Sequence, residues 1–237
     1  MSLSEFFKKF YEVYIIKKGI NLVLEGLVNT LIITFCAIAI GIILGVITAA
    51  VKVTPAKGPK PLRVLIKVLK GIGNAYVALF RGTPIIVQLL VIYWVMLAPL
   101  RIEPMLVAVL VFGLNSGAYV TESVRGGILA VDRGQMEAGR SLGMGYAATM
   151  FKIVLPQAIK NIIPMLANEF VSMIKETSVA GWITVMDVTY ATRQIVGREY
   201  DTFIPYITLA IIYLVIILIA TFFIRLLERR LRKSDKR

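Results

Sequence analysis

The polar side chains best suited to bind a small solute lie inside apolar segments of the chain. Asn115, Tyr119 and Glu122 are spaced by four and three residues, so a helix places them on one face, with Ser116 beside them. A carboxylate can accept hydrogen bonds from an ammonium group, and an amide and a phenol can donate them to a carboxylate. This pattern indicates a site for a zwitterionic solute. An ion pair between Glu122 and Arg125, three residues apart, is an equally good interpretation.

A second polar set lies further along the chain. Asn168, Ser172 and Lys175 share one helix face, and Gln88 stands within an earlier apolar run. Such side chains do not face lipid, so they line a cavity or pack against another helix. We expect all four to contact a solute. The alternatives are a helix-to-helix hydrogen bond for Gln88 and an ion pair between Lys175 and an acid of its own segment, Glu169 or Glu176.

The composition narrows the possible chemistry. The 237 residues are 58% hydrophobic with a mean hydropathy of +0.79, above the roughly 45–50% apolar content of soluble domains. The chain has no His and a single Cys, Cys36. This excludes His-based catalysis, a Cys/His metal site and a disulfide framework, and we predict neither catalytic residues nor a bound metal. The net charge of +13 is better explained by basic membrane-flanking loops than by nucleic-acid binding.

The apolar segments that hold these residues are long enough to cross a bilayer, which takes about 20 residues. We therefore predict an all-α integral membrane protein with about five transmembrane helices. Arg81 to Pro84 mark a kink in the second, which can extend back towards Pro61 as an amphipathic helix. Gly41 and Gly45 in the first indicate close helix packing. The five predicted spans cover residues 22–51, 72–99, 104–124, 159–183 and 203–224.

The distribution of charge predicts the orientation of the chain in the membrane. With the C-terminus in the cytoplasm, 18 of the 27 Lys and Arg residues lie on the inner face and seven on the outer face. The N-terminus is then outside, although four N-terminal lysines oppose this bias. We divide the chain into an interfacial helix (1–19), a transmembrane domain (20–225) and a basic cytoplasmic tail (226–237).

A conspicuous motif lies in the cytoplasmic loop 126–158. Residues Glu137 to Pro156 fit the pattern E-A-x-x-x-x-G-x9-I-x-L-P. We predict a short helix over Gln135 to Leu142 with Glu137 in its first turn, a stop at Gly143 and Gly145, and a second helix from about Ala147. The small and apolar side chains of the first of these helices can enter a groove on a partner protein. The residues that we expect to make this contact are Gln135, Glu137, Ala138, Gly139, Leu142 and Gly143.

This segment resembles the EAA signature of ABC-transporter permeases, although Gly139 stands where the pattern more often has Ala. The likeness extends to Phe80–Leu89, Ser116–Gly143, Leu155–Pro164 and Phe170–Ser178, which look like permeases of polar amino-acid uptake systems. The resemblance implies a type I ABC importer permease fold in the cell membrane, with a cytoplasmic coupling helix. It also implies a second permease copy or paralogue, two cytoplasmic ATPase subunits that bind ATP and Mg, and an external solute-binding protein. The chain lacks the G-x-x-x-x-G-K-[ST] loop, so ATP hydrolysis is expected on a partner.

Two other classes of function fit the sequence less well than a permease. A secondary transporter or channel often shows inverted repeats with paired broken helices, and the five unequal spans show none. An intramembrane enzyme would need a nucleophile beside a base, for which the sequence offers no pattern. The sequence favours a permease subunit for polar amino acids. Glu122 would suit a basic side chain, but every amino acid carries an ammonium group, so the particular amino acid stays open.

Overall fold

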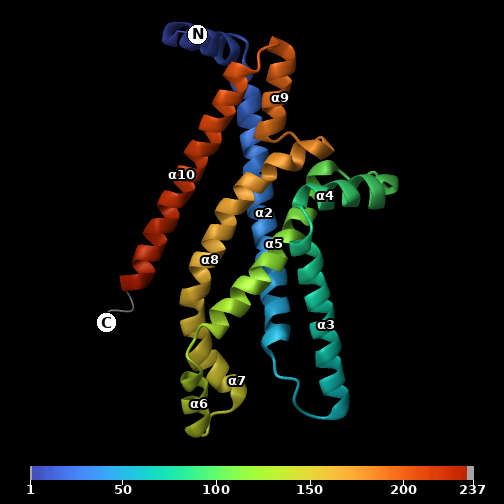
Figure 1. The fold of residues 1–237 in the computed structure, drawn as a ribbon, viewed down its shortest axis with the longest axis vertical. Helices are drawn as coiled ribbons and strands as arrows, with labels where there is room; N and C mark the ends of the chain where they lie inside the picture. Colours follow the sequence, from blue (N-terminus) through green and yellow to red (C-terminus); the bar gives the residue numbers. More distant parts are fainter. Residues whose placement is uncertain (1, 234–237) are drawn as a thin grey trace. The chain divides into compact units, whose positions relative to one another are not determined.

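The computed structural model describes residues 2–233, and every regular element in this range is a helix (Figure 1). Elements labelled η are short π- or 3₁₀-helical pieces. The first half of the chain forms α1 (Leu3–Tyr11), η1 (Glu12–Ile16), α2 (Gly19–Val53), α3 (Lys60–Gly82), α4 (Ile85–Leu90), η2 (Val91–Met96) and η3 (Ala98–Leu100). The second half forms α5 (Pro104–Leu129), α6 (Arg133–Ser141), α7 (Tyr146–Thr149), η4 (Met150–Val154), α8 (Leu155–Glu176), η5 (Thr177–Ile183), α9 (Val188–Glu199) and α10 (Phe203–Lys233).

Four helical segments among the described residues are long and apolar enough to cross a membrane, and a fifth is obtained if a broken pair counts as one span. The four are Gly19–Val53, Pro104–Leu129, Tyr146–Ile183 and Phe203–Arg229. They match the first, third, fourth and fifth predicted spans and extend beyond them. Helix α10 also continues to Lys233, so the predicted basic tail starts as helix; its residues 234–237 lie outside the described part of the chain.

The second predicted span is a pair of helices rather than one. Helix α3 begins at Lys60, as the amphipathic extension predicted, and ends at Gly82. Thr83 then has an extended backbone (φ −126°, ψ 147°) and Pro84 precedes α4. A residue before proline disfavours the helical conformation, and proline has no N–H to donate. The predicted kink at Arg81–Pro84 is therefore a complete interruption of the helix.

The chain divides into two compact units, and α2, α5, α8 and α10 each contribute to both. The first unit contains 1–37, 84–112 and 171–223. Its core joins the N-terminal helices to α9 and α10, with Val13, Tyr14, Val23, Val188, Ile195 and Ile204 buried together. The N-terminal helix has an aromatic face, on which the ring centroids of Phe6 and Phe10 are 6.4 Å apart and those of Phe10 and Tyr14 are 4.9 Å apart.

Charged contacts reinforce the first unit at its surface. Lys17 Nζ lies 2.6 Å from Glu199 Oε2, and Arg198 Nε donates to Glu199 Oε1 over 2.7 Å. The hydrogen bond with Lys17 is the main cause that lowers the pKa of Glu199, and the same bond raises the pKa of Lys17. These contacts link the end of η1 to the end of α9.

The second unit contains 38–83, 113–170 and 224–237. Its core packs α5 against the start of α8, where Ala49, Val120, Val124, Val131, Val154, Ala158 and Ile162 are buried together. Helices α2 and α5 approach closely in this unit. A Cβ atom built on Gly41 would lie 2.6 Å from Ser116 Oγ, and one on Gly45 would lie 2.6 Å from Val120 Cβ. The predicted packing role of Gly41 and Gly45 is therefore confirmed within one chain.

Candidate functional site

The polar stripe of α5 lies in the second unit and faces α3. Asn115 Nδ2 donates to the Phe80 carbonyl over 3.0 Å, and Tyr76 Oη donates to the Leu114 carbonyl over 2.5 Å. The Arg81 guanidinium lies 5.1 Å from the centroid of the Tyr119 ring, within the range of a cation–π interaction. Asn115 and Tyr119 thus connect α5 to the last turn of α3, directly before the Thr83–Pro84 break.

Ser116 occupies the tight crossing of α5 with α2. Its side chain is fully buried, and its hydroxyl has no hydrogen-bond partner among the described residues. A buried hydroxyl without a partner costs free energy relative to a bonded one. Ser116 can therefore donate to a ligand or water that reaches it.

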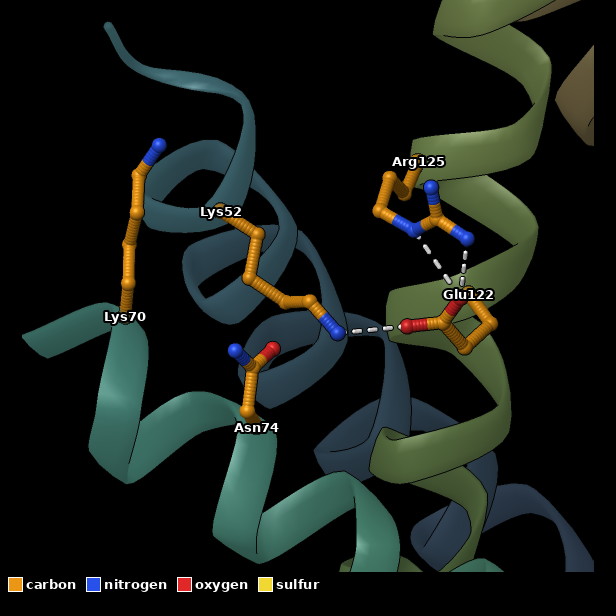
Figure 2. Close-up of a pocket in the computed structure, with 5 residues that line it drawn as sticks. All are labelled: Lys52, Lys70, Asn74, Glu122 and Arg125. Carbon is orange, nitrogen blue, oxygen red and sulfur yellow. Dashed lines mark hydrogen bonds and ion pairs between the residues drawn. The ribbon is translucent and has the colours of Figure 1, made fainter. Parts of the chain in front are cut away.

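Glu122 forms two ion pairs at the cytoplasmic end predicted for α5. Its Oε1 accepts from Lys52 Nζ over 2.6 Å, and its Oε2 accepts from Arg125 Nη2 and Nε over 2.7 and 2.9 Å (Figure 2). The predicted ion pair with Arg125 is confirmed, whereas Lys52 was not anticipated. A solute ammonium would have to displace one of these cations, so the geometry favours the ion-pair interpretation of Glu122.

The ion pairs form one wall of a cavity of about 340 Å³ between α2, α3 and α5. Lys70 and Asn74 from α3 complete its lining (Figure 2). No motif in the sequence distinguishes Lys52, Lys70 or Asn74. Lys52 is 70 residues from Glu122 along the chain, and no local pattern signals such a pair.

The remaining predicted solute contacts are divided between the two units. Asn168 belongs to the second unit and is exposed. Gln88, Ser172 and Lys175 belong to the first unit, where Gln88 is buried on α4, Ser172 is half-buried and Lys175 is exposed on α8. The structure brings Asn115, Ser116, Tyr119 and Glu122 together, and a common site with the residues of the first unit stays a prediction.

The predicted helix-turn motif forms α6 and α7 (Figure 1). Asp132 caps α6, because its Oδ1 accepts from the Gly134 N–H over 2.6 Å. The helix therefore begins at Arg133, earlier than predicted, and Glu137 lies in its second turn rather than its first. Gly143 has φ +82°, the left-handed conformation with which glycine ends helices, as predicted.

The two sides of α6 differ sharply in exposure. Gly139 is buried, and a Cβ atom there would lie 2.5 Å from Thr149 Cγ2 and 3.0 Å from Ile153 Cδ1. Glu137 and Ala138 are exposed, and Leu142 is 82% exposed. Gly139 therefore holds α6 against the following turn of the same chain, while Leu142 presents an apolar side chain to the surroundings.

Gln135 adds a polar contact between α6 and α8. Its Oε1 accepts a hydrogen bond from Gln157 Nε2 over 3.2 Å. The side chain of Gln135 is exposed, so this contact is on the surface of the motif. This hydrogen bond helps to hold α6 beside the start of α8.

A further buried polar residue that the sequence analysis missed is Asp187, in the first unit. Its carboxylate caps α9 by accepting from the N–H groups of Tyr190 and Thr189 over 2.9 and 3.1 Å. Burial raises the pKa of this carboxyl despite those hydrogen bonds. A Cβ atom on Gly26 would lie 2.7 Å from the Asp187 carbonyl, so α2 packs directly on this cap. Asp–Val–Thr before a helical segment was an available N-cap signal.

Solved structures define the class of this fold. The chain matches a crystal structure of an amino acid ABC transporter with histidines, with a TM-score of 0.80 and 40% identity over 91% of this chain and 96% of that one. It also matches an inward-facing MetNI methionine ABC transporter, with a TM-score of 0.73 and 17% identity over 89% and 96% of the two chains. The fold is that of type I ABC importer permeases.

The sequence comparisons identify the family. Residues 41–233 match the family described as binding-protein-dependent transport system inner membrane component, and the chain belongs to it. It is 36% identical to the arginine transport system permease protein ArtQ of Bacillus subtilis (strain 168), over 91% of this chain and 95% of that protein. It is 37% identical to the L-cystine transport system permease protein TcyB of the same organism, over 87% and 85%. The predicted resemblance to ABC-transporter permeases is confirmed.

The structure also bears on metal binding. Among residues 2–233, no three or more Cys, Asp or Glu side chains are grouped so that they could hold a metal ion.

Proposed function

We propose that this permease subunit forms the membrane path of an ATP-driven importer for a polar amino acid. Its relatives include permeases named for arginine, L-cystine and, in Rickettsia bellii (34% identity), putatively glutamine. These solutes share an ammonium and a carboxylate group and differ in their side chains. The relatives support an amino acid as the solute class without selecting one.

The observation that carries the proposal is the exposed leucine on a fixed turn. Leu142 is 82% exposed at the C-terminal end of α6, within the segment that resembles the EAA signature, so its apolar side chain can be buried by a partner protein. The turn is fixed from inside by Gly139 and closed by the left-handed Gly143. A partner that moves α6 would therefore move α7 and the start of α8 with it.

The proposed partner at this surface is a cytoplasmic ATPase subunit, with a second ATPase bound to a second permease copy or paralogue. ATP binding would close the two ATPases and draw the coupling helices with them, and hydrolysis would release them. ATP and Mg would be bound by the ATPases, and an external solute-binding protein would deliver the amino acid. This arrangement places the loop 126–158 and the C-terminus in the cytoplasm and the N-terminus outside.

Within the membrane, we assign the solute contacts first to Asn115, Ser116 and Tyr119. They lie together on α5, next to the interruption between α3 and α4, and the unpartnered Ser116 hydroxyl can donate a hydrogen bond. Glu122 is assigned to the ion pairs with Lys52 and Arg125. The four other residues proposed to contact solute are Gln88, Asn168, Ser172 and Lys175.

The proposal is tested by co-purifying the permease with a candidate ATPase and reconstituting the complex in liposomes. We expect uptake that requires ATP and the solute-binding protein, and ATP hydrolysis that the loaded binding protein stimulates. Uptake by the permease alone, driven by an ion gradient, would instead support a secondary transporter.

A further inference from the structure

The chain between α4 and α5 (Figure 1) borders a cavity that contains one positive and one negative side chain. The cavity has a volume of about 320 Å³ and lies entirely within the first unit. Tyr93 and Trp94 of η2 line one part of it, and Arg101 and Glu103, directly before α5, line another. Its other lining residues are apolar. None of the residues proposed to contact solute lines this cavity.

The two charged side chains of this cavity are unpaired. Arg101 and Glu103 are exposed, and within residues 2–233 neither side chain forms an ion pair or a hydrogen bond. Because no protein group holds them, both can turn towards a ligand. The Cα atoms of residues two apart are separated by no more than about 7 Å, so both charged groups can reach the same small molecule. Their charges cancel, which favours a zwitterion over a simple anion or cation.

The two aromatic rings of the cavity suit the positive end of such a ligand. The ring centroids of Tyr93 and Trp94 are 4.7 Å apart, with the ring planes at 82°. Trp94 is 52% exposed, so its ring is open to contact. Aromatic faces attract ammonium groups, and small-molecule sites combine an apolar lining with a few polar groups in a volume of roughly 300–1,000 Å³. A base, an acid and an aromatic surface together complement a free amino acid.

We propose that this cavity binds a free amino acid at the outer face of the permease, before the solute enters the membrane path. Arg101 binds the α-carboxylate, and Glu103 binds the α-ammonium group beside the ring of Trp94. The sidedness and the solute class rest on the proposed function. These contacts use only groups that all amino acids share, so the site accepts amino acids as a class. Exposed ion pairs are weak, so the ligand is released readily.

The test measures ligand binding at Trp94 in the purified full-length permease in detergent, without ATP. The chain has two tryptophans, so the Trp182→Phe background leaves Trp94, which lines the cavity, as the only indole fluorophore. The titrants are L-arginine, L-glutamine and two analogues of glutamine. L-Glutaminamide lacks the carboxylate, and N-acetyl-L-glutamine lacks the ammonium group.

We expect both amino acids to change the Trp94 fluorescence, and each analogue to bind about two- to fivefold more weakly than L-glutamine, the effect of one exposed ion pair. In Arg101→Gln, L-glutaminamide should bind as well as L-glutamine, while N-acetyl-L-glutamine stays weaker. In Glu103→Gln, the two analogues should exchange these roles. A merely structural role of either residue would not produce this crossed pattern.

Lys18→Gln is the matched control for the charge and the backbone. Lys18 is an exposed cation of the first unit with a positive φ (56°), as Arg101 is (49°), and it lies outside the cavity. This variant should leave all four titrations unchanged, and a loss equal to that in Arg101→Gln would overturn the proposal.

Two other results would also overturn it. If neither amino acid changes the Trp94 fluorescence, Tyr93 and Trp94 are only interfacial aromatic residues of a membrane protein. If Arg101→Gln abolishes the stimulation of ATP hydrolysis by the loaded solute-binding protein while the amino-acid titrations stay unchanged, the surface is a docking site for that protein. The binding assay uses neither ATP nor uptake, so its failure is distinguishable from a failure of the proposed function.

Discussion

The tight crossing of α2 and α5 at Gly41 allows a quantitative test of the fold. A Cβ atom on Gly41 would lie 2.6 Å from Ser116 Oγ and 2.8 Å from Ser116 Cβ. Carbon atoms in van der Waals contact are about 3.5–4.0 Å apart. The Gly41→Ala variant must therefore move the two helices apart by roughly 1 Å or displace the Ser116 backbone.

The expected cost follows from this overlap. Adding a methyl group to a packed interior destabilises a protein by about 1–3 kcal/mol. In a chain of this size each kcal/mol lowers the melting temperature by roughly 2–4 °C, so Gly41→Ala should lower it by about 2–12 °C. Gly71→Ala is the matched control, because Gly71 is also helical and a Cβ atom there meets nothing within 4 Å. It should leave the melting temperature unchanged or raise it slightly.

The assay is thermal unfolding of the purified permease in detergent at a fixed scan rate, since such unfolding is commonly irreversible. Removing the obstructing side chain by Ser116→Gly should restore stability in the Gly41→Ala background, although Ser116→Gly alone should be destabilising. In the double-mutant cycle, the melting temperature of the double variant should then exceed the value expected from the two single losses by about 2 °C or more. A Gly41→Ala variant as stable as Gly71→Ala, or a cycle without coupling, would refute the close approach of α2 and α5.

Two further predictions concern ion pairs. Glu122→Gln leaves Lys52 and Arg125 without their carboxylate, so it should cost on the order of 1–3 kcal/mol in thermal unfolding. In liposome uptake it should leave the order of preference among amino acids unchanged; an altered order would place Glu122 in the solute path. Lys17→Met tests the pair with Glu199. The pKa of Glu199 is lowered from its usual 4.5, so the stability that it contributes is present above pH 4.5 and is lost as pH falls through the lowered value. The pKa of Lys17 is raised from 10.5, so its contribution is present below pH 10.5 and is lost as pH rises through the raised value. The wild type should therefore melt above Lys17→Met at pH 7 and approach it at acidic pH, and a constant difference between pH 7 and pH 3 would contradict this assignment.

Local patterns in the sequence were sufficient for much of this fold. Apolar length located the spans, the Gly41 and Gly45 spacing indicated close packing, and Gly143 indicated the end of α6. Each of these features depends on residues near one another along the chain, so a single sequence contains the information. The position of the kink at Pro84 was predicted correctly. Its extent was not predicted, because the backbone of Thr83 is extended and the helix is fully interrupted there.

Contacts between segments that are distant along the chain were harder to predict from the sequence. The Lys52–Glu122 ion pair joins residues 70 apart, and nothing near Lys52 distinguishes it from the other loop cations. Gly139 was expected on the partner-binding surface, yet it is buried against Thr149. Which face of a helix is exposed depends on how the next element packs against it. The spacing of residues within the motif carries no information about that packing. The Asp132 cap, by contrast, was a readable signal for the true start of α6.

We propose that the exposed turn of α6 and α7 transmits movement from an ATPase to the membrane helices. Leu142 is 82% exposed, so substitutions there should change the stability of the isolated permease by no more than about 0.5 kcal/mol. The direct test compares Leu142→Glu with Leu142→Met in ATPase co-purification and ATP-driven uptake. We predict that Leu142→Glu folds normally but loses the ATPase and uptake, whereas Leu142→Met retains both. Normal assembly and ATP-driven uptake in Leu142→Glu would contradict the claim.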